Sequence, residues 1–186
     1  MTQPRLLTIC GALRAGSTNR QLLAEAVRLF GPATVTEANL RLPLYDGDLE
    51  AAGIPPEVTL LHSRIAAADA IVIATPEYNK SLSGVLKNAL DWVSRVPGPG
   101  PWTARPVAIM SAAAGRAGGE RAQFALRLCL NPFRPLVLPG PEVMLADSAH
   151  AFDAKGRLID PRSVASLTEL MADLRALTLR PQRAAP

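Results

Sequence analysis

The chain has 186 residues, of which 48% are hydrophobic and 19% charged, and its net charge is +4. This length suits one domain with a buried core, and the composition excludes a disordered chain. No apolar run reaches the ~20 residues that cross a bilayer, and the N-terminal residues lack a signal-peptide cleavage pattern. Two scattered cysteines and two scattered histidines give neither a disulfide framework nor a zinc site. We therefore expect a cytoplasmic protein.

The basic residues are spread along the chain rather than clustered. Most arginines stand singly, and no basic run is interleaved with aromatic residues in the way that nucleic-acid binding requires. We therefore expect neither a nucleic acid nor a membrane as a partner. A positive surface still attracts small ligands that carry phosphate.

Short apolar runs alternate with amphipathic stretches from one end of the chain to the other. The runs predict buried strands at 5–10, 33–40, 69–75, 105–111 and 134–140. The amphipathic stretches predict a helix between residues 20 and 32, and further helices at 57–68, 83–95, 118–130 and 161–179. Residues 42–56 are expected to form a long loop, and 97–101 a stiff connector.

This alternation predicts an α/β fold, with one domain over residues 1–180 and a flexible tail at 181–186. Five buried strands between helices indicate a doubly wound, five-stranded parallel sheet covered on both faces. Right-handed crossovers leave two leading strand orders, the flavodoxin-like order 2-1-3-4-5 and the Rossmann order. In either, ligands bind beyond the carboxyl ends of the strands.

The loop after the first strand has the sequence GALRAGSTNR, at 11–20. Its glycines permit a tight turn, and Ser17, Thr18 and Asn19 place polar side chains at the start of a helix. Free N–H groups and the helix dipole make such a terminus an anion site, to which Arg14 can add a charge-assisted bond. The alternative is that these side chains merely cap the helix. The loop lacks the glycine spacing of dinucleotide-binding and P-loop motifs.

The loop after the third strand reads TPEYNKSLSG. Pro76 ends the strand, so that Glu77, Tyr78 and Asn79 project from the ligand-binding end of the sheet. A flat ligand ring with polar edges needs an aromatic or backbone surface and a few polar groups, which this segment supplies. In the alternative, Glu77 is a surface charge and Ser83 a plain helix cap.

The loop after the fourth strand, SAAAGRAGGE, is small and rich in glycine. Residues without bulk let a flat ligand approach the backbone closely, although a merely flexible loop would look the same. The three loops contain no serine–histidine–aspartate set and no carboxylate pair, and Cys10 is best explained as a core residue. Such a site suits a cofactor that carries the chemistry itself.

Four stretches resemble the NADPH-dependent FMN reductase family, which includes quinone, chromate and azo-dye reductases. They are GALRAGSTNR, TPEYNKSLSGVLKNALDW, the glycine-rich loop with the following RAQFALR, and AFDAKGRLID. Together they cover nearly the whole chain in the family's order, and PEYN…LKNALDW is the most specific of them. The resemblance implies a flavodoxin-like fold, FMN as cofactor, and NADPH or NADH as co-substrate.

The resemblance also implies a role for each loop. The family's FMN-phosphate loop is matched by Arg14, Ser17, Thr18 and Asn19. The segment along the isoalloxazine ring is matched by Pro76, Glu77, Tyr78 and Asn79. The third loop near the flavin is matched by residues 111–115, from which Ser111, Ala112 and Gly115 are taken as contacts. Family members form homodimers or dimer-based tetramers, so the apolar face of the 83–95 helix is expected to contribute to an interface.

Three positions depart from the family's pattern. Ala12 stands where serine is usual, Ser83 where proline is usual, and residues 112–114 are alanines where hydroxyl groups are common. We expect the main pattern to hold, with FMN bound more weakly.

The sequence thus predicts an oxidoreductase that carries hydride from NAD(P)H through FMN to a small acceptor such as a quinone, in a ping-pong cycle. One alternative is a flavodoxin-type electron carrier, although such carriers are usually acidic. Another is a binding module on the same fold that has lost the flavin. The 2′-phosphate of NADPH would need an arginine, for which Arg14, Arg116 or a partner subunit are candidates.

Overall fold

Six short parallel strands form the central sheet of the computed structural model, which describes residues 3–178. The strands are β1 (Arg5–Cys10), β2 (Thr34–Glu37), β3 (Ala70–Thr75), β4 (Pro106–Ala112), β5 (Leu136–Val137) and β6 (Val143–Leu145). The α-helices are α1 (Thr18–Phe30), α2 (Gly47–Ala52), α3 (Pro56–Ala67), α4 (Gly84–Val93), α5 (Glu120–Leu130) and α6 (Pro161–Thr178). The expected tail at 181–186 lies outside the described residues.

The strands lie in the order β2-β1-β3-β4-β5, so the flavodoxin-like prediction is confirmed and the Rossmann order is excluded. The three central strands are buried on both faces, apart from the first residue of β1. Their uninterrupted apolar sequences are those of strands with a helix layer on each side. Register pairs such as Ile73 with Ile109 align them in parallel.

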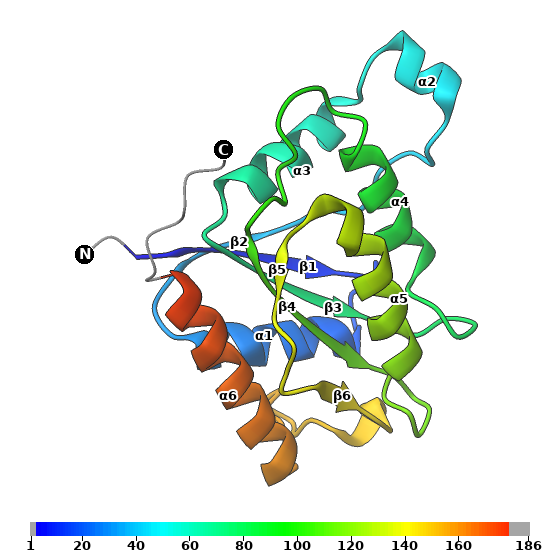
Figure 1. Ribbon diagram of the computed structural model, residues 1–186. Coiled ribbons are helices and arrows are strands. Elements are labelled where there is room, and N and C mark those ends of the chain that lie inside the picture. The colour runs from blue at the N-terminus through cyan, green and yellow to red at the C-terminus, as the bar shows by residue number, and fades with distance from the viewer. Residues whose placement is uncertain (1–2, 179–186) are drawn as a thin grey trace.

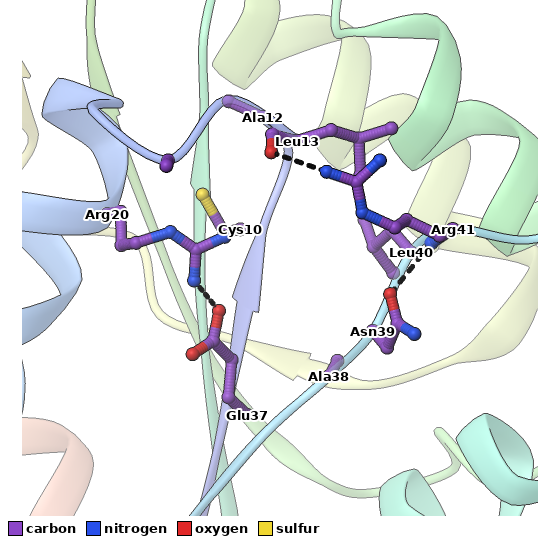
Figure 2. Close-up of a pocket in the computed structure, with 10 residues that line it drawn as sticks. Cys10, Ala12, Leu13, Arg20, Glu37, Ala38, Asn39, Leu40 and Arg41 are labelled. Atoms are coloured by element: carbon purple, nitrogen blue, oxygen red, sulfur yellow. Dashed lines mark hydrogen bonds and ion pairs between the residues drawn. The ribbon is translucent and has the colours of Figure 1, made fainter.

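The edges of the sheet differ from the prediction. β2 covers only Thr34–Glu37 of the predicted 33–40 and is largely exposed. Its last residue, Glu37, forms an ion pair with Arg20 of α1 (Figure 2). The predicted fifth strand at 134–140 is reduced to β5, and β6 follows it as a strand that was not predicted; both pair with β4. Pro139 and Pro141 fall between them, and a proline has no N–H for the ladder.

The predicted long loop at 42–56 contains a short helix, α2, which stands at one end of the molecule (Figure 1). Asp46 caps this helix by accepting a hydrogen bond from the N–H of Asp48. The segment before it is anchored on α4, because Asn88 and Trp92 both donate to the carbonyl oxygen of Pro43, at 2.9 and 2.8 Å.

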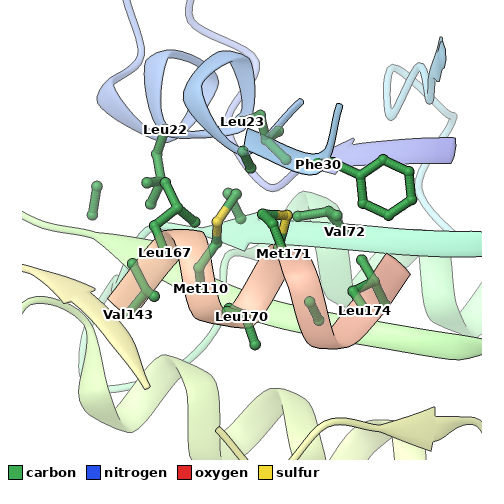
Figure 3. Packing of buried hydrophobic residues seen from close by; sticks show 14 of the residues in the cluster. Leu22, Leu23, Phe30, Val72, Met110, Val143, Leu167, Leu170, Met171 and Leu174 are labelled. Carbon is green, nitrogen blue, oxygen red and sulfur yellow. The ribbon is translucent and has the colours of Figure 1, made fainter. Parts of the chain in front are cut away.

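Helices α1 and α6 cover one face of the sheet, and α3, α4 and α5 cover the other (Figure 1). On one face α1 and α6 pack against the sheet through leucines, Phe30 and Met171 (Figure 3). On the other face, α3, α4 and α5 pack around Ile71, Ile73 and Ile109. The apolar face of α4 is buried in this second core, so it is not free to form the expected subunit interface. None of the described helices is both long and apolar enough to cross a membrane.

A buried carboxylate joins α1 to the segment that precedes α6. The Glu25 side chain is 3% exposed and accepts hydrogen bonds from Arg28 at 2.9 Å and Arg157 at 2.7 Å. Hydrogen bonding from Arg28 lowers the pKa of Glu25 to about 2, against the cost of burial and with help from Arg157. Its contribution to stability is therefore present above pH 4.5 and is lost as the pH falls toward 2.

We expect Glu25→Gln to lower the free energy of unfolding by about 2 kcal/mol at pH 7, because two arginines lose a charged partner. The difference from the wild type should shrink as the pH is lowered below 4.5. Urea unfolding between pH 7 and 3 measures it, with the exposed Glu169→Gln as the control. A difference that stays constant over this range would show that the ion pairs contribute nothing.

Candidate active site

The carboxyl ends of β1, β3 and β4 meet at one edge of the sheet. Cys10 pairs with Ala74, and Thr75 pairs with Ser111, so the loops that follow the three strands emerge side by side. The chain leaves β1 toward α1 on one face and leaves β3 toward α4 on the other. This is the reversal point at which doubly wound folds bind their ligands.

The first loop, residues 11–17, presents a series of free backbone donors. Within the described residues, the N–H groups of residues 12–18 have no hydrogen-bond partner. Ser17 caps α1, since its hydroxyl accepts from the N–H of Asn19 at 3.2 Å. Arg14 is exposed and donates to the carbonyl oxygen of Gly16 at 2.8 Å. The capping interpretation is therefore correct for Ser17, and the backbone N–H groups of the loop remain available as donors.

The side chain of Asn19 connects the first loop to the third. It is 2% exposed, its Nδ2 donates to the carbonyl oxygen of Ala112 at 2.8 Å, and its Oδ1 accepts from the N–H of the same residue at 3.0 Å. Ala112 is the last residue of β4. The pairing of β3 with β4 ends one residue earlier, at Ser111, so the amide continues the ladder along β4 in place of β3. It also fixes the start of α1 against the end of β4.

Gly11 lets the first and second loops approach each other. A Cβ at this position would lie 3.0 Å from Thr75 Oγ1, 3.1 Å from Ser83 Oγ and 3.2 Å from Pro76 Cδ. Ser83 is buried and accepts a hydrogen bond from the N–H of Leu86, which caps α4. Serine at 83, where the resemblance expects proline, therefore has a structural role at this contact.

The second loop is a tight turn rather than a flexible segment. Tyr78 and Ser81 exchange both backbone hydrogen bonds, at 3.0 and 3.1 Å, and Asn79 and Lys80 between them have φ of 49° and 66°. Two central residues with positive φ define a type I′ turn. Glu77 holds the turn against α5, since it accepts from the N–H of Arg121 at 3.0 Å and pairs with its guanidinium. Tyr78 is left 58% exposed.

The third loop is shorter than predicted, because β4 continues through Ala112. Ser111 is fully buried, its hydroxyl donates to the carbonyl oxygen of Gly118 at 2.6 Å, and it accepts from Gln123 at 2.9 Å. Gly118 and Gly119 have positive φ and touch Met144 and Ser111, so a side chain at either would clash. Gly115, by contrast, is exposed and has open space around it.

The structure therefore divides the predicted site residues into two groups. The residues that face outward are Arg14, Tyr78, Asn79 and Gly115, with Thr18 and Glu77 half-buried. The residues that are buried and hold the loops together are Ser17, Asn19, Pro76, Ser111 and Ala112. Sequence reasoning missed two buried polar residues of this framework, Gln123 and Ser148, and the second of these accepts a hydrogen bond from Thr18 at 3.0 Å. For Gln123, the signal in the sequence was a single glutamine among the apolar residues on the buried face of α5.

A cavity of about 490 Å³ opens on the other side of the first loop, over the ends of β1 and β2 (Figure 2). It is lined by Cys10, Ala12, Leu13 and Ala15, by Arg20 and by residues 37–41, and we call it the β1–β2 cavity. Among the described residues, no group of histidine, cysteine or acidic side chains is placed to hold a metal ion.

We expect Asn19→Ala to lower the free energy of unfolding by about 2 kcal/mol, because it leaves the buried N–H and carbonyl groups of Ala112 without partners. Urea unfolding of this variant and of Asn131→Ala, an exposed asparagine with no side-chain hydrogen bond among the described residues, gives the comparison. Equal stability of the two variants would contradict the role of the Asn19 side chain.

Within the third loop, Gly118→Ala should destabilise the protein by about 3 kcal/mol, because the new Cβ would lie 2.7 Å from the backbone of Met144 at a left-handed φ. Gly115→Ala should leave stability nearly unchanged. Thermal unfolding of the two variants measures the difference, and a comparable loss in both would mean that the loop is not packed as described.

Comparison with known proteins places the chain in a family. Residues 4–150 match the family model described as NADPH-dependent FMN reductase. An NAD(P)H-dependent FMN reductase of Pseudomonas aeruginosa is 47% identical over 161 residues, which cover 86% of each chain. A quinone reductase of Escherichia coli is 37% identical over 170 residues, covering 88% of this chain and 89% of that one.

A solved structure agrees with these sequences. The flavoenzyme FerB of Paracoccus denitrificans, described as an NAD(P)H:(acceptor) oxidoreductase, superposes with a TM-score of 0.85 at 29% identity. The match covers 94% of this chain and 97% of that one. The family model, these relatives and the strand order agree, and the chain belongs to the NADPH-dependent FMN reductase family.

Proposed function

We propose that this protein is an FMN-dependent NAD(P)H oxidoreductase that reduces quinones or similar small acceptors in a ping-pong cycle. The observation that carries the proposal is the row of N–H groups at residues 12–18, which have no partner among residues 3–178. They lie at the edge of the sheet where the three loops contact one another. The same family and the relatives at 47% and 37% identity support an enzyme of this class.

The residues present fit FMN. The N–H groups of residues 12–18 suit its phosphate, since they surround the N-terminus of α1, and Arg14 adds a positive charge. Ala12 removes a hydroxyl that the resemblance expects, but backbone donors remain at this loop. The turn at Pro76–Asn79 and the small residues 113–115 offer two surfaces for the flat ring. Hydrogen bonds of Glu77 to α5 and of Ser111 to Gly118 hold these two surfaces in place.

The described residues provide positioning rather than acid–base chemistry. When bound, FMN accepts hydride from NAD(P)H and passes the electrons to the acceptor. We assign Tyr78 and Asn79 to contact with the ring or the acceptor, because both are exposed on a rigid turn. Asn19, Ser111 and Glu77 act indirectly, because their polar atoms are bonded to the neighbouring loops.

We also propose that residues 1–180 act as one domain, in the cytoplasm, in a homodimer or dimer-based tetramer. The sheet and both cores draw on elements from β1 to α6, which supports one domain. The apolar face of α4 is buried, so a subunit contact needs another surface. Phe124 and Leu128, one turn apart on α5, are 52% and 75% exposed and supply such an apolar face.

The proposal is tested by the visible spectrum of the FMN-loaded protein under nitrogen. Bound flavin should show bands near ~370 and ~450 nm that bleach on adding NADPH and return with a quinone. Binding without bleaching would indicate an electron carrier, and no binding would indicate a flavin-free module. Either outcome would contradict the proposed activity.

Within this experiment, Tyr78→Ala should weaken FMN binding or raise the KM of the acceptor by about tenfold, because a flat surface on the turn is lost. Tyr78→Phe, which keeps the ring, should behave like the wild type. Fluorescence titration with FMN and steady-state kinetics measure the two effects. Identical behaviour of all three proteins would remove Tyr78 from the site.

A further inference from the structure

The β1–β2 cavity has the size and lining of a small-molecule site, and it shares only the first loop with the proposed flavin contacts. Its volume of about 490 Å³ lies within the ~300–1,000 Å³ typical of ligand pockets. It opens over β1 and β2, whereas the second and third loops follow β3 and β4 on the opposite side of β1. The first loop belongs to both, because residues 12, 13 and 15 line the cavity and the N–H groups of residues 12–18 are proposed to bind the flavin phosphate.

The lining combines an apolar base with a charged rim. Cys10, Ala12, Ala38 and Leu40 are all buried and form the apolar part. Such a surface accommodates a planar heteroaromatic ring, for which polar groups at the rim fix the orientation. Arg20, Glu37 and Arg41 are the charged side chains of the lining, which therefore carries a net charge of +1 from two cations and one anion.

The two arginines approach the cavity from different sides, Arg20 from α1 and Arg41 from the segment after β2 (Figure 2). Arg20 is paired with Glu37. Arg41 has no carboxylate partner in the part of the chain that the structure describes, and its Nη2 donates to the carbonyl oxygen of Leu13 at 3.1 Å. The guanidinium has five N–H groups, so most of its donors remain free for an anion.

The segment that carries Arg41 is also held in place. The N–H of Arg41 donates to Oδ1 of Asn39 at 3.0 Å, which closes a local turn. Together with the bond to Leu13, this fixes the guanidinium between the first loop and the cavity. An arginine positioned in this way is suited to bind a phosphate with little loss of conformational entropy.

We propose that the β1–β2 cavity binds the adenosine end of NADPH, with Arg41 as the principal contact of the 2′-phosphate and Arg20 as a second cation. This inference rests on the proposed function, which requires a nicotinamide dinucleotide to react at the flavin. The nicotinamide end must reach the second and third loops, so the adenosine end has to lie elsewhere. A cavity that shares the first loop with the flavin phosphate is placed for it.

The two arginines that the sequence analysis named as contacts of the 2′-phosphate fit this role less well than Arg41. Arg14 is turned onto the carbonyl oxygen of Gly16 in its own loop, and Arg116 is exposed in the third loop. Neither lines the β1–β2 cavity. The structure therefore assigns NADPH preference to Arg41, a residue that no motif of the sequence singled out.

The direct test is calorimetric titration of the FMN-loaded protein with adenosine 2′,5′-bisphosphate, which carries the 2′-phosphate but cannot react. The bisphosphate should bind at least about tenfold more weakly to Arg41→Ala and Arg41→Gln than to the wild type or to Arg162→Ala, a distant exposed control. Adenosine 5′-monophosphate, which lacks the 2′-phosphate, should bind all four proteins equally. Failure of the wild type to bind the bisphosphate would overturn the proposal.

Kinetics supply the second readout. Arg41→Ala should raise the KM of NADPH about tenfold while the KM of NADH, kcat and the affinity for FMN stay unchanged. An equal rise for both dinucleotides would overturn the assignment of the 2′-phosphate, and weaker FMN binding would assign the cavity to the flavin instead. The calorimetric result does not depend on turnover, so it separates failure of this inference from failure of the proposed activity.

Discussion

The candidate site depends on the pair of hydrogen bonds between the Asn19 side chain and the backbone of Ala112. The pairing of β3 with β4 ends at Thr75 and Ser111, one residue before Ala112, and Asn19 binds the N–H and carbonyl groups of Ala112 instead. A buried amide that both donates and accepts is the side chain that can replace a strand here. Because Asn19 lies in the first turn of α1, the same contact sets the first loop, with its free N–H groups, at a fixed distance from the third.

Other contacts extend this arrangement around the edge of the sheet. Gly11 brings the first loop against Pro76, Glu77 fastens the second loop to α5, and Thr18 reaches Ser148. Each contact uses a polar group or a missing side chain rather than apolar packing. These contacts fix the loops before a cofactor binds. Binding a flat cofactor therefore costs less conformational entropy.

Strand order and helix positions were predictable because buried parallel strands and amphipathic helices leave strong patterns in the sequence. The short helix α2 was missed, although Asp46 and Gly53 mark its start and end in the usual way. The early end of β5 and the separate strand β6 were also missed, although Pro139 and Pro141 stand between the two strands. In both cases the sequence contained the signal, but the predicted loop at 42–56 and the predicted strand at 134–140 were assigned too broadly to use it.

The sequence predicted where the candidate site lies, but not what each of its residues does there. The motifs located all three loops, yet they could not show that Ser111 and Asn19 are turned inward toward other loops, because those contacts join residues far apart in the sequence. For the same reason the importance of Gly118 over Gly115 was hidden: it depends on contact with Met144. The β1–β2 cavity likewise forms only when the first loop meets the segment after β2.

The central claim is that FMN binds over the first, second and third loops, with its phosphate at residues 12–18. A crystal structure of the protein with FMN tests this most directly. The account predicts that the phosphate accepts hydrogen bonds from the N–H groups of that loop, with the ring against Tyr78 and residues 113–115. Flavin in the β1–β2 cavity, or a ring placed away from the turn at Tyr78, would contradict it.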